Sequence, residues 1–189
     1  FAAGPGADGP LQRGVALVAR SVYEAAGRWD LSVEAGRRIE ARWPEVAGAV
    51  DYWDNNTAWA LFRAFPDDPA SVDDGLVRVR RALRDAPSEH TVRNTLALGL
   101  LLDGQAGAAE AELHELMLGA GADERRQDVY LHVLALLALD RGAEALAEYR
   151  GALAELGPGE MQPEARDGLV GAGLLSAEEA DHLEAAGGG

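Results

Sequence analysis

Histidines are the residues of this sequence best able to bind a metal ion or transfer protons near neutral pH. There are four of them, His90, His114, His132 and His182. A helical metal site needs two histidines about one turn apart, and no two of these are that close. The stretch "HELM" at 114–117 begins like a zinc-protease motif, but Leu118 stands where its second histidine would be. We predict no metal site, and we expect His132, inside an apolar stretch, to be a packed core residue.

Acidic residues occur in adjacent pairs, at 67–68, 73–74 and 178–179. Carboxylate catalysis needs two groups across a pocket with separated pKa values, whereas neighbouring acids near helix starts are typical of helix caps. No serine lies in a G-x-S-x-G motif, and the absence of cysteine and lysine excludes thiol and Schiff-base chemistry. We therefore predict no catalytic residues and do not expect an enzyme.

The stretch "GPGADG" near the start has the spacing G-x-G-x-x-G of a dinucleotide-binding loop. No strand precedes it, and Pro10 follows where a phosphate-binding helix should begin. We interpret residues 1–10 as a flexible lead-in and residues 187–189 as a tail, and we predict no cofactor.

Composition points to helices and to a strongly acidic surface. Hydrophobic residues make up 48% of the 189 residues, mostly Ala and Leu, and aromatic residues only 6%. No apolar run reaches the roughly 18 residues that a membrane span needs, and a formal net charge of −15 excludes a general nucleic-acid binder. We expect an all-α chain without membrane insertion. Because it begins at Phe1 without a methionine, we expect a fragment or processed chain, and we take the cytoplasm as its location.

Between its ends the sequence repeats a pattern of helix, short turn and helix, with a period in the mid-thirties to low forties. In the first unit, Gly27 supplies a left-handed turn and Pro44 is expected to end the second helix. Four hairpins are predicted, at about 11–44, 51–87, 90–119 and 126–158. The connection in the second hairpin is lengthened by residues 66–69, and Ser71 with Asp74 resembles a capping box.

Large and small residues recur at matching positions of the four units. The large ones end the first helices, and the small ones let the second helices approach: Tyr23, Leu61, Leu100 and Leu136, then Ser32, Gly75, Ala109 and Ala145. With Tyr149, Ala152 and Pro158 in the last unit, this pattern resembles the tetratricopeptide repeat (TPR) family. The resemblance covers about residues 11–158 and implies a right-handed α-solenoid that binds other proteins. Arg20 and Gly36 depart from the family pattern, as does the third unit, which lacks the closing proline.

Residues 159–186 are predicted to form two short helices that cap the array, the second starting with a capping box of Ser176 and Glu179. The sequence leaves open whether this segment instead folds back over the binding groove.

First helices line the concave side of stacked hairpins, so we expect their free positions to contact a partner. These positions are Tyr52, Asn55, Asn56, Trp59, Arg63, Asn94, Thr95, Leu98, Tyr130 and Leu134. Asparagines can clamp an extended backbone and aromatics can anchor it. Alternatively, Trp59 and Leu98 pack between repeats, and Asn55 and Asn56 cap a helix.

The acidic balance favours a basic or apolar segment of another protein as the partner, although solubility explains the acidity equally well. We interpret the chain as a non-catalytic scaffold or adaptor module. Two alternatives are an accessory or regulatory domain of a larger enzyme and a structural homo-oligomer.

Overall fold

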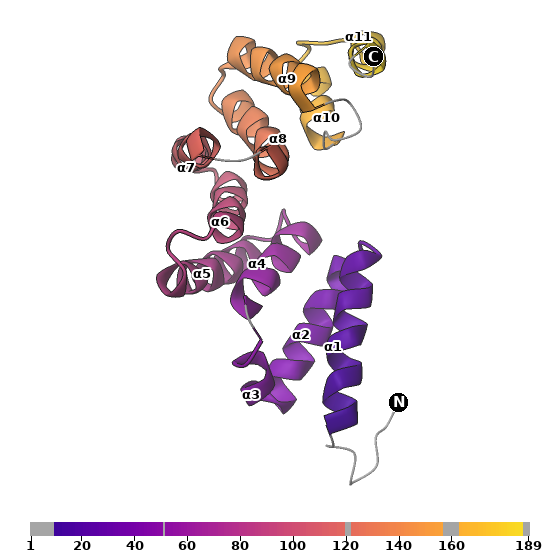
Figure 1. The fold of residues 1–189 in the computed structure, drawn as a ribbon, viewed down its shortest axis with the longest axis vertical. Coiled ribbons are helices and arrows are strands. Elements are labelled where there is room, and N and C mark those ends of the chain that lie inside the picture. Colours follow the sequence, from indigo (N-terminus) through magenta and orange to yellow (C-terminus); the bar gives the residue numbers. More distant parts are fainter. Residues whose placement is uncertain (1–9, 51, 120–121, 157–162, 187–189) are drawn as a thin grey trace. The chain divides into compact units, whose positions relative to one another are not determined.

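The computed structural model describes residues 10–50, 52–119, 122–156 and 163–186, and within these ranges it contains eleven helices and no strand (Figure 1). The prediction of an all-α chain is confirmed. Contacts divide the chain into two units, 1–86 and 87–189, at the junction between the second and third predicted hairpins. The predicted lead-in at 1–9, the start of the C-terminal segment at 159–162 and the tail at 187–189 lie outside the described residues.

Unit 1 consists of two helix pairs and a short connecting helix. Its helices are α1 (Pro10–Ala25), α2 (Trp29–Arg42), α3 (Pro44–Ala47), α4 (Trp53–Ala64) and α5 (Pro69–Asp85). Helix α1 packs on α2, α4 packs on α5, and α2 also packs on α4. The core between them is built on Ile39, Trp43 and Trp53, against which Ala16 and Leu17 of α1 pack.

Unit 2 continues with two further pairs and two short helices. They are α6 (His90–Leu102), α7 (Ala106–Gly119), α8 (Ala122–Ala138), α9 (Gly142–Leu156), α10 (Pro163–Gly171) and α11 (Ala177–Ala186). Each of α6 to α9 packs on the next, α10 packs on α8 and α9, and α11 packs on α9 and α10. Tyr149, Leu113, Leu131 and Leu169 are fully buried at these contacts.

Four helices end in the same way, with a residue in the left-handed conformation that closes the last turn. These residues are Gly27, Gly104, Asp140 and Gly173, with φ of 66°, 75°, 57° and 70°. After the first, the Arg28 N–H donates to the carbonyl of Tyr23 at 2.8 Å, five residues back, and the Gly27 N–H donates to that of Glu24 at 3.0 Å. The other three repeat both bonds, which together form a Schellman motif. Asp140 is the one residue of these four that is not glycine. Aspartate tolerates the left-handed conformation better than most other residues.

The second pair departs from this plan, as its lengthened connection predicts. Asp68 caps α5 by accepting from the backbone N–H of Ser71 at 3.2 Å, and Pro69 occupies the first helical position. The predicted capping box of Ser71 with Asp74 is therefore wrong, because the helix begins two residues earlier.

Two prolines of unit 1 each begin a helix. The prediction that the second helix ends before Pro44 is confirmed, because α2 ends at Arg42, and Pro44 also starts α3. Pro10, assigned to the lead-in, is the first residue of α1. Both fit the preference for proline at the first helical position, where the missing N–H costs no hydrogen bond.

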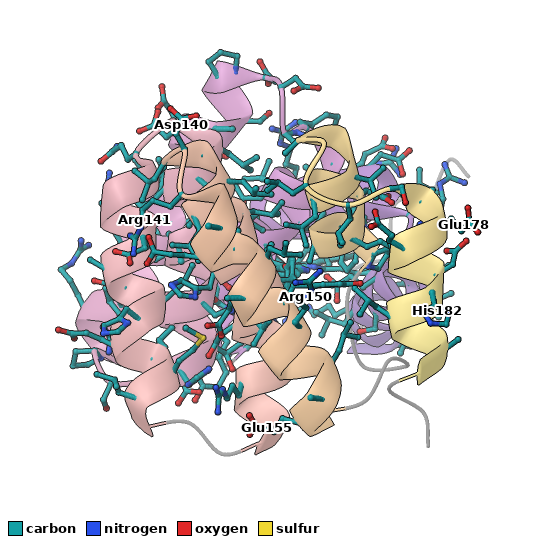
Figure 2. The ribbon with its side chains drawn as sticks, turned by 90° about the horizontal axis from the view of Figure 1, so that it is seen from above. Asp140, Arg141, Arg150, Glu155, Glu178 and His182 are labelled. Atoms are coloured by element: carbon teal, nitrogen blue, oxygen red, sulfur yellow. The ribbon has the colours of Figure 1, made fainter. Side chains whose placement is uncertain are left out.

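The C-terminal capping box forms as predicted. The Ser176 N–H donates to Glu179 Oε2 at 2.8 Å, and the Glu179 N–H donates to Ser176 Oγ at 3.1 Å. The bonds that the Ser176 N–H and hydroxyl donate to the carboxylate lower the pKa of Glu179, and Arg150 adds to the effect. Figure 2 shows Arg150 extending from α9 toward α11.

Small residues stand where paired helices approach each other. Ser32, Ala109 and Ala145 are fully buried, and so is Gly75 on α5. A Cβ added at Gly75 would lie 2.3 Å from Cε1 and 2.8 Å from Cζ of Phe62, a buried ring of α4. The ring contact therefore requires glycine at this position of α5.

No helix in the described part of the chain is both long and apolar enough to cross a membrane.

Replacing Gly75 by alanine should lower the free energy of unfolding by about 2 kcal/mol, because overpacking against Phe62 forces the two helices apart. Gly151→Ala is the matched control, since an added Cβ there meets no atom within 4 Å in α9. It should raise stability by about 0.5–1 kcal/mol through helix propensity. Urea denaturation followed by circular dichroism measures both, and equal effects of the two substitutions would contradict the close approach.

Candidate functional site

A network of charged side chains surrounds the indole of Trp53, which is buried at the centre of unit 1. Its Nε1–H donates to Glu40 Oε1 of α2 at 2.8 Å. The Arg20 guanidinium of α1 lies 4.2 Å from the ring centroid, a cation–π distance, and also pairs with Glu24 at 2.9 Å. Glu24 in turn accepts from Ser32 Oγ of α2 at 2.8 Å. The indole thereby joins α1, α2 and α4.

Arg20 and Gly36, the two departures from the predicted repeat pattern in the first unit, compensate each other. A Cβ added to Gly36 would lie 3.5 Å from Arg20 Nη1 and 4.0 Å from Trp53 Cζ2. The large residue of this pair stands in the first helix and the small one in the second, so a long guanidinium passes over the glycine to reach Trp53.

Arg78 of α5 completes the network from the other side. Its two terminal nitrogens bind Glu40 at 2.6 and 3.0 Å, and Nε binds Asp74 at 3.1 Å. Arg81 pairs with Asp54 of α4. Burial acts to raise the pKa of Glu40, but the hydrogen bonds from Arg78 and Trp53 outweigh it and hold that pKa below its ordinary value. Glu40 is therefore ionised at neutral pH.

Beside this network unit 1 is hollowed by a cleft of about 730 Å³, which we call the unit 1 cleft. It lies between the end of α2, α3, the start of α4 and the end of α5. Its lining residues are Glu40, Ala47, Gly48, Val50, Tyr52, Trp53, Asp54, Arg81, Ala82, Asp85 and Ala86. Its volume is in the range of ordinary binding pockets.

Tyr52 and Asp85 are the exposed side chains of this cleft that are best placed to meet a partner. Tyr52 precedes α4 in the left-handed conformation, with φ of 57°, and half of its surface is exposed. Asp85 ends α5 and forms no ion pair with the described residues, whereas Glu40 and Asp54 are bound by arginines. The lining has three carboxylates and one guanidinium, and no Ser, Cys, His or Lys. An aromatic ring beside an acidic group suits a cation with an aliphatic stem.

The predicted partner-binding residues of unit 1 lie on or near α4. Tyr52 lines the cleft, and Asn56 is exposed in the first turn of the helix. Trp59 and Arg63 are half-buried, with the guanidinium 5.9 Å from the ring centroid. Asn55 is buried, so its amide does not lie on the surface.

In unit 2 the predicted residues are largely enclosed. Asn94, Thr95, Leu98 and Tyr130 are buried, and Leu134 is half-buried against Gly168 of α10. Their role in binding a partner stays a prediction. Most of them are buried and therefore also pack against other residues of unit 2.

Asn94 shows such a contact most clearly. Its amide donates to Asp128 Oδ1 of α8 at 2.6 Å, and Asp128 is fully buried. His90 Nε2 lies 2.8 Å from Asp128 Oδ2, without the alignment of a hydrogen bond. The amide that we expected to clamp a partner is therefore used to satisfy a buried carboxylate.

Sequence reasoning missed Glu40, Arg81 and Asp85 as members of one site. Glu40 comes from α2, whereas Arg81 and Asp85 come from α5, and only the packing of α2 on α4 and of α4 on α5 brings the two helices to one cleft. The one local signal was Tyr52, an aromatic residue at the start of a helix.

No known protein family, curated protein or solved structure matches this chain. The resemblance to tetratricopeptide repeats therefore stays a prediction. Within the described ranges, no group of three or more His, Asp or Glu side chains is arranged to hold a metal ion.

His132 of α8 is buried, which confirms it as a core residue. Neither ring nitrogen has a hydrogen-bond partner among the described residues. Burial lowers the pKa of His132, which Glu148 and Glu110 oppose and His114 and Arg141 reinforce. The folded protein therefore favours the neutral ring more than the unfolded chain does.

Replacing Arg78 by methionine should lower the free energy of unfolding by about 2 kcal/mol, because Glu40 and Asp74 lose charged hydrogen bonds while the aliphatic stem is kept. Arg84→Met on the same helix is the control, since the Arg84 guanidinium is exposed and, among the described residues, binds only the carbonyl of Arg80. It should change stability by less than about 0.5 kcal/mol. Denaturant titration of both variants checks this, and a similar loss in both would contradict a special role for Arg78.

His132 should make stability fall as the pH is lowered through 6.5, because the unfolded chain takes up a proton there that the folded chain does not. His132→Leu should remove this part of the pH dependence, so the variant gains on the wild type as the pH falls. Unfolding free energies between about pH 7.5 and pH 5.5 measure it, with the exposed His182→Leu as the control. A constant difference between wild type and His132→Leu across that range would contradict the lowered pKa.

Proposed function

We propose that this chain is a non-catalytic interaction module of helical hairpins resembling tetratricopeptide repeats, and that the unit 1 cleft binds a basic segment of another protein. The observation that carries the proposal is the pairing of exposed Tyr52 with the carboxylate of Asp85 across one cleft.

A lysine or arginine side chain of the partner fits this cleft by its two parts. Its aliphatic stem would lie along Ala82, Ala86 and the ring of Tyr52. Its charged end would reach Asp85, which the arginines of the network do not occupy. Glu40 and Asp54 lie behind, and the formal charge of −15 on the whole chain favours the approach of a cation.

Three further residues extend this surface along α4. Asn56, Trp59 and Arg63 follow Tyr52 at intervals of four, three and four residues, so they share one face of the helix. Asn56 offers both a donor and an acceptor to an extended backbone. The partner segment would thus have its basic residue in the cleft and its backbone along α4.

The right-handed solenoid remains part of the proposal. It is supported by the recurrent Schellman turns after α1, α6 and α8 and by the buried small residues in each second helix. The turns join the two helices of a hairpin and the small residues let these helices pack closely, and such hairpins are the units that a repeat array stacks.

Binding of short peptides to the full chain tests the proposal. Fluorescence anisotropy should show that lysine- and arginine-containing peptides bind and that their aspartate and glutamate counterparts do not. Tyr52→Ala and Asp85→Asn should each weaken binding about tenfold, which corresponds to about 1.4 kcal/mol of lost contact. Asp67→Asn is the control, because it removes an equal charge from an exposed site of unit 1 outside the cleft.

The Asp67→Asn control distinguishes binding in the cleft from attraction by the net charge of the chain. If Asp67→Asn weakens binding as much as Asp85→Asn, the attraction comes from the net charge of the chain and the cleft is not the site. Failure of every basic peptide to bind would also overturn the proposal.

A further inference from the structure

Helix α1 exposes a row of large apolar side chains. Leu11, Val15, Val18 and Val22 have 80%, 61%, 63% and 57% of their surface exposed. They follow one another at intervals of four, three and four residues, so they form one stripe along the helix. Exposed apolar patches of this kind mark interaction surfaces in soluble proteins. We call these four residues the α1 stripe.

The charged residues of the same helix are engaged elsewhere. Arg13 pairs with Glu45 of α3 at 3.0 Å. Arg20 and Glu24 belong to the network around Trp53 and Ser32. These three are all the charged residues of α1. The helix therefore differs from an ordinary surface helix, because its charged side chains are paired toward the rest of unit 1 and its large apolar side chains are exposed.

We propose that the α1 stripe is the seam of a twofold dimer, in which α1 of one copy packs on α1 of a second copy. A twofold contact places the same patch of both copies against each other, so an apolar stripe meets an apolar stripe and is complementary to itself. Since the chain carries a formal net charge of −15, two copies repel each other over most of their surfaces. The stripe avoids this repulsion, because it carries no ionisable group.

The spacing and shape of the stripe also suit the packing of one helix on another. Intervals of four, three and four are those of the core positions of a coiled coil. They place Leu11 at a d position and Val15 and Val22 at a positions, and β-branched residues at a with leucine at d favour two strands. The residues that flank the stripe are small and uncharged, namely Gly14, Ala19 and Ser21. They let a second helix come close without a charge being buried.

This dimer is independent of the proposed function. None of the four stripe residues lines the unit 1 cleft, so a variant that separates the copies should still bind basic peptides. Loss of the dimer and loss of peptide binding are therefore distinguishable.

Sedimentation equilibrium of the full chain tests the proposal. The wild type should approach twice the mass of one chain at high micromolar concentration. Val15→Glu with Val18→Glu should weaken self-association more than about a hundredfold, because like charges then face each other across the seam. Val77→Glu is the control, since Val77 of α5 is equally exposed at 62% and lies off the stripe, and it should leave the dimer intact. Circular dichroism verifies that the variants stay helical.

Disulfide trapping gives a second measurement that does not depend on the glutamate variants folding. The chain has no native cysteine, so a Val15→Cys, Val18→Cys variant can form a covalent dimer only through the stripe. Mild oxidation should trap it quickly whether the two helices run parallel or antiparallel, while Val77→Cys should react slowly. A wild type that stays monomeric, a dimer that survives in the double glutamate variant, or equal trapping of the Val77→Cys control would overturn the proposal.

Discussion

The buried indole of Trp53 is the contact on which unit 1 depends. Its ring receives the Arg20 guanidinium from α1, and its N–H binds Glu40 of α2, which Arg78 of α5 also holds. A charge this far from water is stable only when it is paired, so each helix must supply the partner of a charge on another. The hydrophobic effect drives the same helices together, but it is non-directional. The ion pairs and the indole decide which side of α1 faces inward.

That choice shapes both proposed surfaces of the protein. Because Arg13, Arg20 and Glu24 are paired toward α2, α3 and α4, the valines of α1 are left exposed. Because Arg78 and Arg81 neutralise Glu40 and Asp54, Asp85 is the carboxylate of the unit 1 cleft left for a partner. The two proposed surfaces have opposite electrostatic requirements. Negative charge in the cleft attracts a basic segment, whereas contact with a second acidic copy requires a surface without charge.

The repeated hairpins position these surfaces through two local devices. A left-handed residue ends the first helix of three pairs, and a small residue sits where the second helix approaches. The second pair replaces the turn by a longer connection, and its close approach is set by Gly75 against Phe62. The longer connection ends in Asp68, whose cap and the following proline start α5 earlier than its sequence pattern indicates.

The sequence by itself determined the helices, the left-handed turn at Gly27, the C-terminal capping box and the small residues of the helix contacts. Each of these follows from a few residues that are neighbours in the chain, so local rules suffice. Sequence reasoning failed at Ser71, because Asp68 followed by Pro69 is a competing signal for the start of the same helix. It did not anticipate that Asn94 binds Asp128, because the two residues are 34 positions apart in the chain. Only the tertiary structure decided that Arg20 and Gly36 compensate, that Glu40 and Asp85 share a cleft with Tyr52, and that α1 has its apolar stripe exposed. Burial and ion pairing act between residues far apart in the chain, and a one-dimensional pattern does not encode which of two faces a helix turns inward.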